Sequence, residues 1–118
     1  MDLGGSTIKK ASVLITTLAF IAAPAAYGNG GGNVAAGKDA YMKHCATCHG
    51  ADGNGKEAVA KPLKVTFPPL GSKEVQALSD AEMHNVLLEG KGKMKPVKDL
   101  DRSDIPNLIA FVRSLAKK

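Results

Sequence analysis

The pentapeptide Cys45-Ala46-Thr47-Cys48-His49 constrains this chain more than any other stretch of its sequence. Two cysteines three positions apart lie on one side of a single helical turn, and a histidine follows them directly. This is the C-x-x-C-H pattern of covalent haem attachment, in which both thiols become thioethers to the porphyrin. Cys45 and Cys48 are therefore predicted to hold one haem c per chain. His49 is predicted to be the proximal ligand of its iron.

The same pentapeptide is compatible with three further kinds of site, and each fits less well. A zinc site needs four ligands, and the chain has only two cysteines, so a further histidine besides His49 would have to take part. A thioredoxin-like dithiol needs a βαβ context, and the sequence has no strand alternation. A chance match without chemistry is the third alternative.

Residues 1–28 have the layout of a secretory signal peptide. Lys9 and Lys10 precede an apolar run at residues 11–23, and small residues follow at Ala25, Ala26 and Gly28. The run is short for a membrane span, which takes ~20 residues. We therefore expect export to the periplasm, with membrane attachment only if this segment is not cleaved. Both cysteines lie inside the motif, so no other thiol competes for them in an oxidising compartment.

The composition of the exported part indicates a small core built around a cofactor. The Gly-rich stretch at 29–33 is predicted to be a linker, and residues 34–118 are predicted to form one domain. A domain of this size has a marginal apolar core of its own. Its aromatic side chains are only Tyr41, Phe67 and Phe111. We infer that a haem fills the middle of the domain.

The charge of the exported part is modest. It has 14 basic and 10 acidic residues, a net charge of +4, once Asp2, Lys9 and Lys10 are left out of the formal +5. Such a charge, with so few aromatic residues, does not suggest nucleic-acid binding. We expect a monomer whose partners are redox proteins.

The hydrophobic pattern predicts helices joined by loops. Residues 34–44 suit a helix that leads into the haem motif, and 50–55 are rich in turn residues. Residues 56–72 hold three prolines and are expected to be mostly irregular, with a short helix at 57–60. Ser79-Asp80-Ala81-Glu82 is a capping box that opens a helix, and Gly90 is suited to end it.

The last helix is predicted from apolar residues at helical spacing, namely Ile105, Leu108, Ile109, Val112 and Leu115. Pro106 is tolerated only in the first turn of a helix. We therefore place the N-cap of this helix at Ser103 rather than Asp101. The preceding residues, 91–100, are expected to form a loop.

From residue 34 to residue 118 the chain resembles the class I monohaem cytochromes c of bacterial periplasms. The matching features are Gly37-x-x-x-Tyr41-x-x-x-Cys45-Ala46-Thr47-Cys48-His49-Gly50, Asp52-Gly53-x-Gly55, Gly92-Lys93-Met94 and Leu108-Ile109-Ala110-Phe111-Val112-x-Ser114-Leu115. The resemblance implies an all-α class I cytochrome c fold wrapped around one haem. It also implies that the first and last helices cross, with Gly37 and Tyr41 against Phe111.

The resemblance implies Met94 as the distal iron ligand and a proline carbonyl as the acceptor for His49 Nδ1. Pro62 is the preferred proline, although Pro68 and Pro69 also qualify. Among rival distal ligands, Met42 and Met83 lie on apolar helix faces, where methionine usually packs in a core. His84 is expected to be a partly exposed helix residue. His44 points away from the side expected for His49.

Ligation by His49 and Met94 implies a carrier of single electrons and not an enzyme, because both axial positions of the iron are filled. Lysines cluster around Met94 and could form a docking surface for acidic redox partners; they are Lys91, Lys93, Lys95 and Lys98, with Lys56, Lys61 and Lys64 as further candidates. Ordinary solvated lysines are an equal alternative. Two other functions stay open: a haem enzyme or gas sensor with a free sixth position, and an electron-transfer subunit of a larger oxidoreductase.

Overall fold

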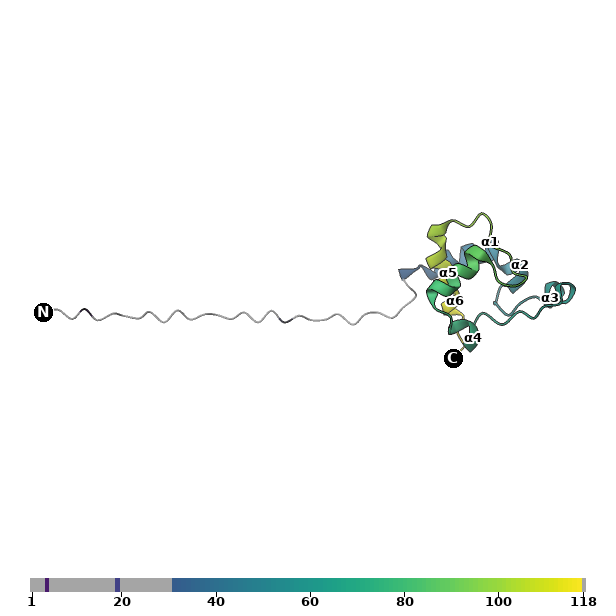
Figure 1. Cartoon of the computed structure of the whole chain (residues 1–118), viewed down its shortest axis with the longest axis horizontal. Helices are drawn as coiled ribbons and strands as arrows, with labels where there is room; N and C mark the ends of the chain where they lie inside the picture. Colours follow the sequence, from purple (N-terminus) through teal and green to yellow (C-terminus); the bar gives the residue numbers. More distant parts are fainter. Residues whose placement is uncertain (1–3, 5–18, 20–30, 118) are drawn as a thin grey trace.

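The computed structural model describes Gly4, Ala19 and residues 31–117 (Figure 1). The predicted signal peptide and the start of the predicted linker lie outside these residues. The described part contains the helices α1 (Val34–His44), α2 (Ala46–His49), α3 (Glu57–Leu63), α4 (Lys73–Gln76), α5 (Asp80–Glu89), the 3₁₀ turn η2 (Arg102–Asp104) and α6 (Ile105–Ser114). Residues 31–117 form no β-strand, so the all-α prediction is confirmed. None of the helices described is long and apolar enough to cross a bilayer.

Helices α1 and α6 cross at close range, as predicted. A Cβ atom added at Gly37 would overlap the carbonyl of Asn107 and lie 3.0 Å from Cβ of Phe111, so only glycine allows this approach. One turn further along α1, the ring of Tyr41 packs on the ring of Phe111 with centroids 4.9 Å apart. Asn33 caps α1, and its N–H donates to the side chain of Asn107 at 2.8 Å. These contacts fix the crossing at two successive turns.

Helix α6 also supplies both apolar clusters of the core. Leu108 and Phe111 join Tyr41 in a cluster shared with α1, and Ile105 and Ile109 join Met83 in a second cluster shared with α5. Of the side chains described, Tyr41, Ile105 and Leu108 are the largest that are fully buried. Because one face of α6 is shared between two partners, α6 is the element against which the other helices are placed.

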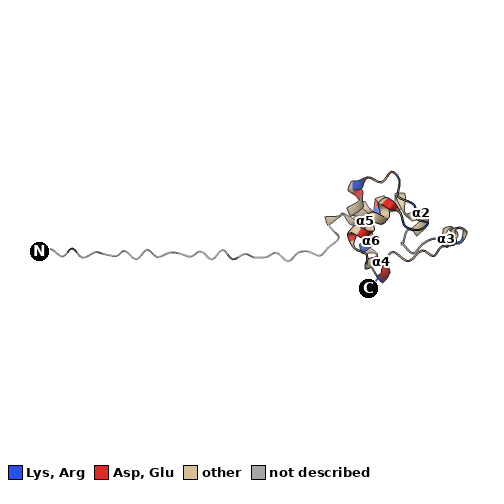
Figure 2. Ribbon diagram, in the orientation of Figure 1, with Lys and Arg blue, Asp and Glu red and all other residues tan. Residues whose placement is uncertain are grey.

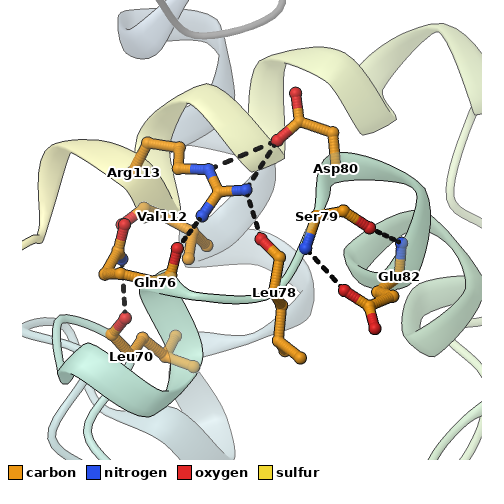
Figure 3. A network of polar contacts seen from close by, with 8 residues as sticks. All are labelled: Leu70, Gln76, Leu78, Ser79, Asp80, Glu82, Val112 and Arg113. Carbon is orange, nitrogen blue, oxygen red and sulfur yellow. Dashed lines mark hydrogen bonds and ion pairs between the residues drawn. The ribbon is translucent and has the colours of Figure 1, made fainter.

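A polar network ties the loop before α5 to the end of α6, and we call it the Arg113 clamp (Figure 3). The guanidinium of Arg113 donates to the carbonyl oxygens of Gln76 at 2.7 Å and Leu78 at 2.6 Å, and to Asp80 Oδ1 at 2.7 Å. The side-chain amide of Gln76 donates to the carbonyl oxygens of Leu70 at 2.8 Å and Val112 at 2.9 Å. Neither the clamp nor α4 was predicted from the sequence.

The predicted helix ends are correct for α5 and wrong for α6. Ser79 and Glu82 form both hydrogen bonds of the capping box, and Gly90 ends α5 with φ 78°. At the last helix, the side chain of Asp101 accepts from the N–H of Ser103 at 2.8 Å and caps η2. The predicted N-cap at Ser103 is therefore wrong: the N-cap of α6 is Asp104, which makes no side-chain cap bond, and Asp101 caps the 3₁₀ turn before it. Pro106 still lies in the first turn of α6, because the 3₁₀ turn precedes that helix.

The segment between the haem motif and α4 is more helical than predicted. Helix α3 runs to Leu63, beyond the expected end at residue 60, and it includes Pro62 near its C-terminus. Lys64 ends the helix in the left-handed region with φ 53°. Helix α3 has no buried residue, and Figure 1 shows it projecting from the rest of the domain.

Candidate haem site

The two cysteines of the motif lie at the junction of α1 and α2. Cys45 is the C-cap residue of α1, and its N–H donates to the carbonyl of Tyr41 at 2.8 Å. Ala46 is buried in the α1–α6 cluster, which anchors the first turn of α2 to the core. Cys45 and Cys48 are free and half-buried. The site is therefore attached to the best-packed part of the domain.

The chain after His49 folds back on α2 and satisfies its last carbonyl groups. The N–H of Gly55 donates to the His49 carbonyl at 2.7 Å, and the N–H of Lys56 donates to the Cys48 carbonyl at 2.9 Å. Gly50 and Gly55 adopt φ values of 76° and 84°, which favour glycine. The glycines predicted to form a turn thus hold a helix of only one turn in place.

The imidazole of His49 lies against the ring of Phe67, with centroids 5.4 Å apart. Burial lowers the pKa of His49 below its ordinary value, which favours the neutral ring that a metal requires. Its Nδ1 atom is buried and has no hydrogen-bond partner among the described residues. The predicted bond to a proline carbonyl is therefore not formed. Pro62, the preferred candidate, lies instead within the projecting α3.

The thiols differ from those of a redox dithiol. Burial, followed by the nearby Cys48, raises the pKa of the Cys45 thiol to about 11. A reactive dithiol depends on the opposite shift, toward the thiolate. Within residues 31–117, no group of three or more His, Cys, Asp or Glu side chains could hold a metal ion, so zinc has no support either. Two free thiols and an imidazole whose pKa is lowered by burial together fit haem c.

Met94 lies in the loop that follows α5. Its N–H and carbonyl exchange two hydrogen bonds of 2.9 Å with Lys91, and the N–H of Val97 donates to the Leu87 carbonyl at 3.0 Å. A Cβ at Gly90 would overlap the Met94 carbonyl, so glycine is required at the start of the loop. Met94 is half-buried. The loop that carries it is bonded to α5 before Met94, where the N–H of Gly90 donates to the Val86 carbonyl at 2.9 Å, and after it, at Val97.

The rival distal ligands occupy other surroundings. Met83 is buried among Ile105 and Ile109, as its helical position predicted, whereas Met42 is 46% exposed. His84 is half-buried and lines a groove of about 360 Å³ between α5 and α6, to which the motif contributes no residue. His44 is half-buried at the end of α1.

Sequence reasoning missed the role of Phe67 at the site and a second contact of Tyr41. Phe67 packs on the imidazole, and a Cβ at Gly55 would lie 2.6 Å from Phe67 Cβ, so this aromatic also covers the turn after the motif. The hydroxyl of Tyr41 donates to the carbonyl of Gly50 at 2.6 Å. The sequence signal that could have indicated Phe67 is its position as a lone aromatic residue in a Pro-rich segment.

Comparisons with known proteins agree with this geometry. Residues 32–112, well over half of the chain, match the family model described as cytochrome c oxidase, cbb3-type, subunit III. Among solved structures, the KustC0563 c-type cytochrome is 31% identical with a TM-score of 0.58, and the match covers 69% of this chain and 98% of that one. No curated protein matches the chain.

Cytochrome CL from the marine methylotrophic bacterium Methylophaga aminisulfidivorans MPT is 25% identical with a TM-score of 0.55. That match covers 70% of this chain and 53% of cytochrome CL, so the chain spans about half the length of that protein. The family model and both solved structures are described as c-type cytochromes or as a subunit of a cytochrome c oxidase, which agrees with the resemblance that the sequence showed. The chain belongs to the cbb3-type subunit III family of c-type cytochrome domains, which bind haem c covalently and transfer electrons through it.

Proposed function

We propose that this protein is a soluble periplasmic carrier of single electrons, with one haem held by Cys45 and Cys48. His49 and Met94 are the axial iron ligands in this proposal. The observation that carries it is the donor set at the motif, where both thiols are free and burial lowers the pKa of the imidazole, which favours its neutral form. When bound, the haem supplies reversible one-electron exchange at its iron.

The choice of Met94 rests on what the other candidates already do. Met83 fills the core beside Ile105 and Ile109, so its use as a ligand would open a hole in the α5–α6 packing. His84 lies in the groove between α5 and α6. Met94 belongs to neither apolar cluster and lies in a loop whose backbone is fixed. A thioether there would favour the reduced iron more than a second imidazole would.

In this proposal the protein fixes His49 and Met94 and excludes water from the iron. The turn at Gly50 and Gly55 fixes the backbone of His49, and Phe67 covers one side of its ring. The pair of hydrogen bonds with Lys91 limits the movement of Met94. A haem iron held by both His49 and Met94 would have no free position for a substrate, so the site would perform no bond-making chemistry.

The partners in this proposal are redox proteins with acidic surfaces. The lysines of the Met94 loop are all exposed, as are those on or beside α3 (Figure 2). Lys61 pairs with Glu57 at 2.9 Å, and the pair is 75% and 79% exposed, so water screens it strongly. Such a surface would act mainly by speeding the encounter with an acidic partner.

Electron-transfer rates at increasing ionic strength test the docking surface. We expect the rate with an acidic partner to fall as salt rises, and Lys93→Glu with Lys95→Glu to flatten that dependence. Lys73→Glu, at an exposed position on α4, is the matched control with the same change of charge per site. If the electron-transfer rate of the unmodified protein does not change with ionic strength, the lysines form no docking surface and are ordinary solvated side chains.

The carrier role itself is tested by fractionating a periplasmic extract from a bacterium that matures c-type cytochromes. We expect the haem-bearing protein to elute at the size of a monomer, with a mass that equals the processed chain plus one haem. A measured mass without a porphyrin adduct would contradict the proposal, because the haem is the group that carries the electron.

One observation favours a second candidate, an electron-transfer subunit of a larger oxidoreductase. The matching family model is described as a subunit of a cbb3-type cytochrome c oxidase. In that case the haem-bearing protein would elute with other polypeptides at a much larger size. The same fractionation therefore separates the two candidates.

A further inference from the structure

The hydroxyl of Tyr41 connects the helix crossing to the haem motif. It donates to the carbonyl oxygen of Gly50 at 2.6 Å, and the Tyr41 side chain is only 1% exposed. Gly50 is the residue directly after His49. A buried hydrogen bond thus runs from the middle of α1 to the peptide that follows the proposed iron ligand.

The turn after His49 also has local backbone hydrogen bonds. The Gly50 N–H donates to the Ala46 carbonyl at 2.9 Å, and the Gly50 carbonyl accepts from the N–H of Gly53 at 3.2 Å. These bonds join Gly50 only to residues within four positions, and α2 itself has four residues and no side-chain cap. The Tyr41 hydroxyl is the contact that ties the Gly50 carbonyl to α1.

The ring of Tyr41 is fixed by its packing on α6. It packs on Phe111 of α6 with centroids 4.9 Å apart, beside the close approach at Gly37. Burial raises the pKa of Tyr41 to about 12, so the hydroxyl stays a donor at neutral pH. The position of the hydroxyl is thus set by the crossing of α1 and α6.

We infer that Tyr41 is a positioning residue for His49. It anchors the backbone after the proximal ligand to the crossing of α1 and α6, and so fixes the imidazole relative to Cys45 and Cys48. This inference rests on the proposed role of His49 as an axial ligand. The hydroxyl acts through the Gly50 peptide and touches neither the imidazole nor the cysteines.

The test uses Tyr41→Phe in the full haem-bearing protein, because this change keeps the ring on Phe111 and removes only the hydroxyl. Loss of one such hydrogen bond should speed amide exchange at Gly53 and Gly55 by about 2- to 10-fold, while amides of α5 stay unchanged. The NMR shifts of the His49 ring protons and the midpoint potential should change as well.

Ile109→Val is the matched control, because it loosens the separate apolar cluster that α6 shares with α5 and leaves the Tyr41 ring and hydroxyl in place. We expect it to lower stability without moving the His49 ring shifts or the potential. Unchanged exchange and ring shifts in Tyr41→Phe would overturn the inference, as would equal changes in both variants. If Tyr41→Phe does not acquire haem, the exchange of the Tyr41 hydroxyl proton with water is measured in the unmodified protein. Slow exchange supports the inference, and rapid exchange overturns it.

The proposed function can fail separately in the same samples. If the unmodified protein shows no iron-shifted His49 ring protons, the ligand assignment is wrong, whatever the exchange rates are. If those protons are shifted as expected and Tyr41→Phe leaves them in place, only the role of Tyr41 is wrong.

Discussion

The Arg113 clamp and the haem motif lie in one domain but differ in where their partners come from. In the clamp, all three guanidinium nitrogens donate, and the amide of Gln76 donates twice, always to groups of this chain (Figure 3). At the motif, both thiols are free, and a buried nitrogen of His49 has no partner among the described residues. The chain alone completes the first region, whereas the second keeps two free thiols that a haem would use and a buried Nδ1 that the described residues leave unpaired.

The packing shows the same contrast. Helix α6 buries five residues against α1 and α5, whereas α3, which follows the motif, buries none. Stability that comes from the chain should therefore reside in the crossing and the clamp. Order around the motif should depend on the haem. The following experiments test this division, beginning with the largest expected effect.

Replacing both attachment cysteines, Cys45→Ala with Cys48→Ala, should have the largest effect. Without the thioethers the haem is lost, and a domain of this size has too small a core to fold well by itself. We expect the cooperative melting transition, followed by circular dichroism, to disappear. A sharp transition in the haem-free double variant would show that the chain completes the motif region too.

The next largest effect is expected from Gly37→Val, which places side-chain atoms where Asn107 and Phe111 already lie. The helices would have to separate, at a cost of about 3 kcal/mol in the free energy of unfolding. Lys38→Val introduces the same residue at an exposed neighbouring position and should cost well under half as much. Equal losses in denaturant unfolding would contradict the close crossing.

Arg113→Met should cost about 2 kcal/mol, because it leaves the carbonyls of Gln76 and Leu78 without their donors. Asp80→Asn is the matched test of the ion pair alone. Asp80 is 49% exposed, so this change should cost under about 1 kcal/mol. If the clamp is independent of the haem, the visible spectrum should be unchanged in both variants.

The smallest effect is expected from pH. The pKa of Tyr41 rises from 10.0 to about 12 on folding, mainly through burial and then through Cys45 and Asp52. A raised pKa contributes stability that is complete below pH 10 and is lost as the pH rises toward 12. The unmodified protein should thus lose about 1 kcal/mol more than Tyr41→Phe between pH 9 and pH 11. Parallel pH profiles would contradict a buried, hydrogen-bonded hydroxyl.

The parts of the fold that could be predicted are those written in local patterns. The capping box needs only Ser79 and Glu82. The crossing at Gly37 was expected from the resemblance and not from a local pattern. The Arg113 clamp could not be predicted, since its acceptors are backbone carbonyls up to 37 positions away, and any residue can supply those. The cap of α6 could not be predicted either, because a 3₁₀ turn capped by Asp101 precedes the helix and moves its N-cap to Asp104.

At the site, the sequence predicted the motif but not what surrounds the imidazole. The proline carbonyl was expected from the resemblance, yet Phe67 lies on the ring and Nδ1 remains unpaired. The segment that joins the motif to α4 has no periodic pattern, so its path depends on tertiary contacts such as that of Phe67 with Gly55. That path could not be predicted from local spacing.

The absorption spectrum of the oxidised protein tests the central claim, that His49 and Met94 hold the haem iron from opposite sides, most directly. Methionine-ligated ferric haem has a weak long-wavelength band, which we expect in the unmodified protein and in the control Met42→Leu. Met94→Ala should lose the band while the haem stays attached. A spectrum without the band in the unmodified protein, or one that keeps it in Met94→Ala, would contradict the account.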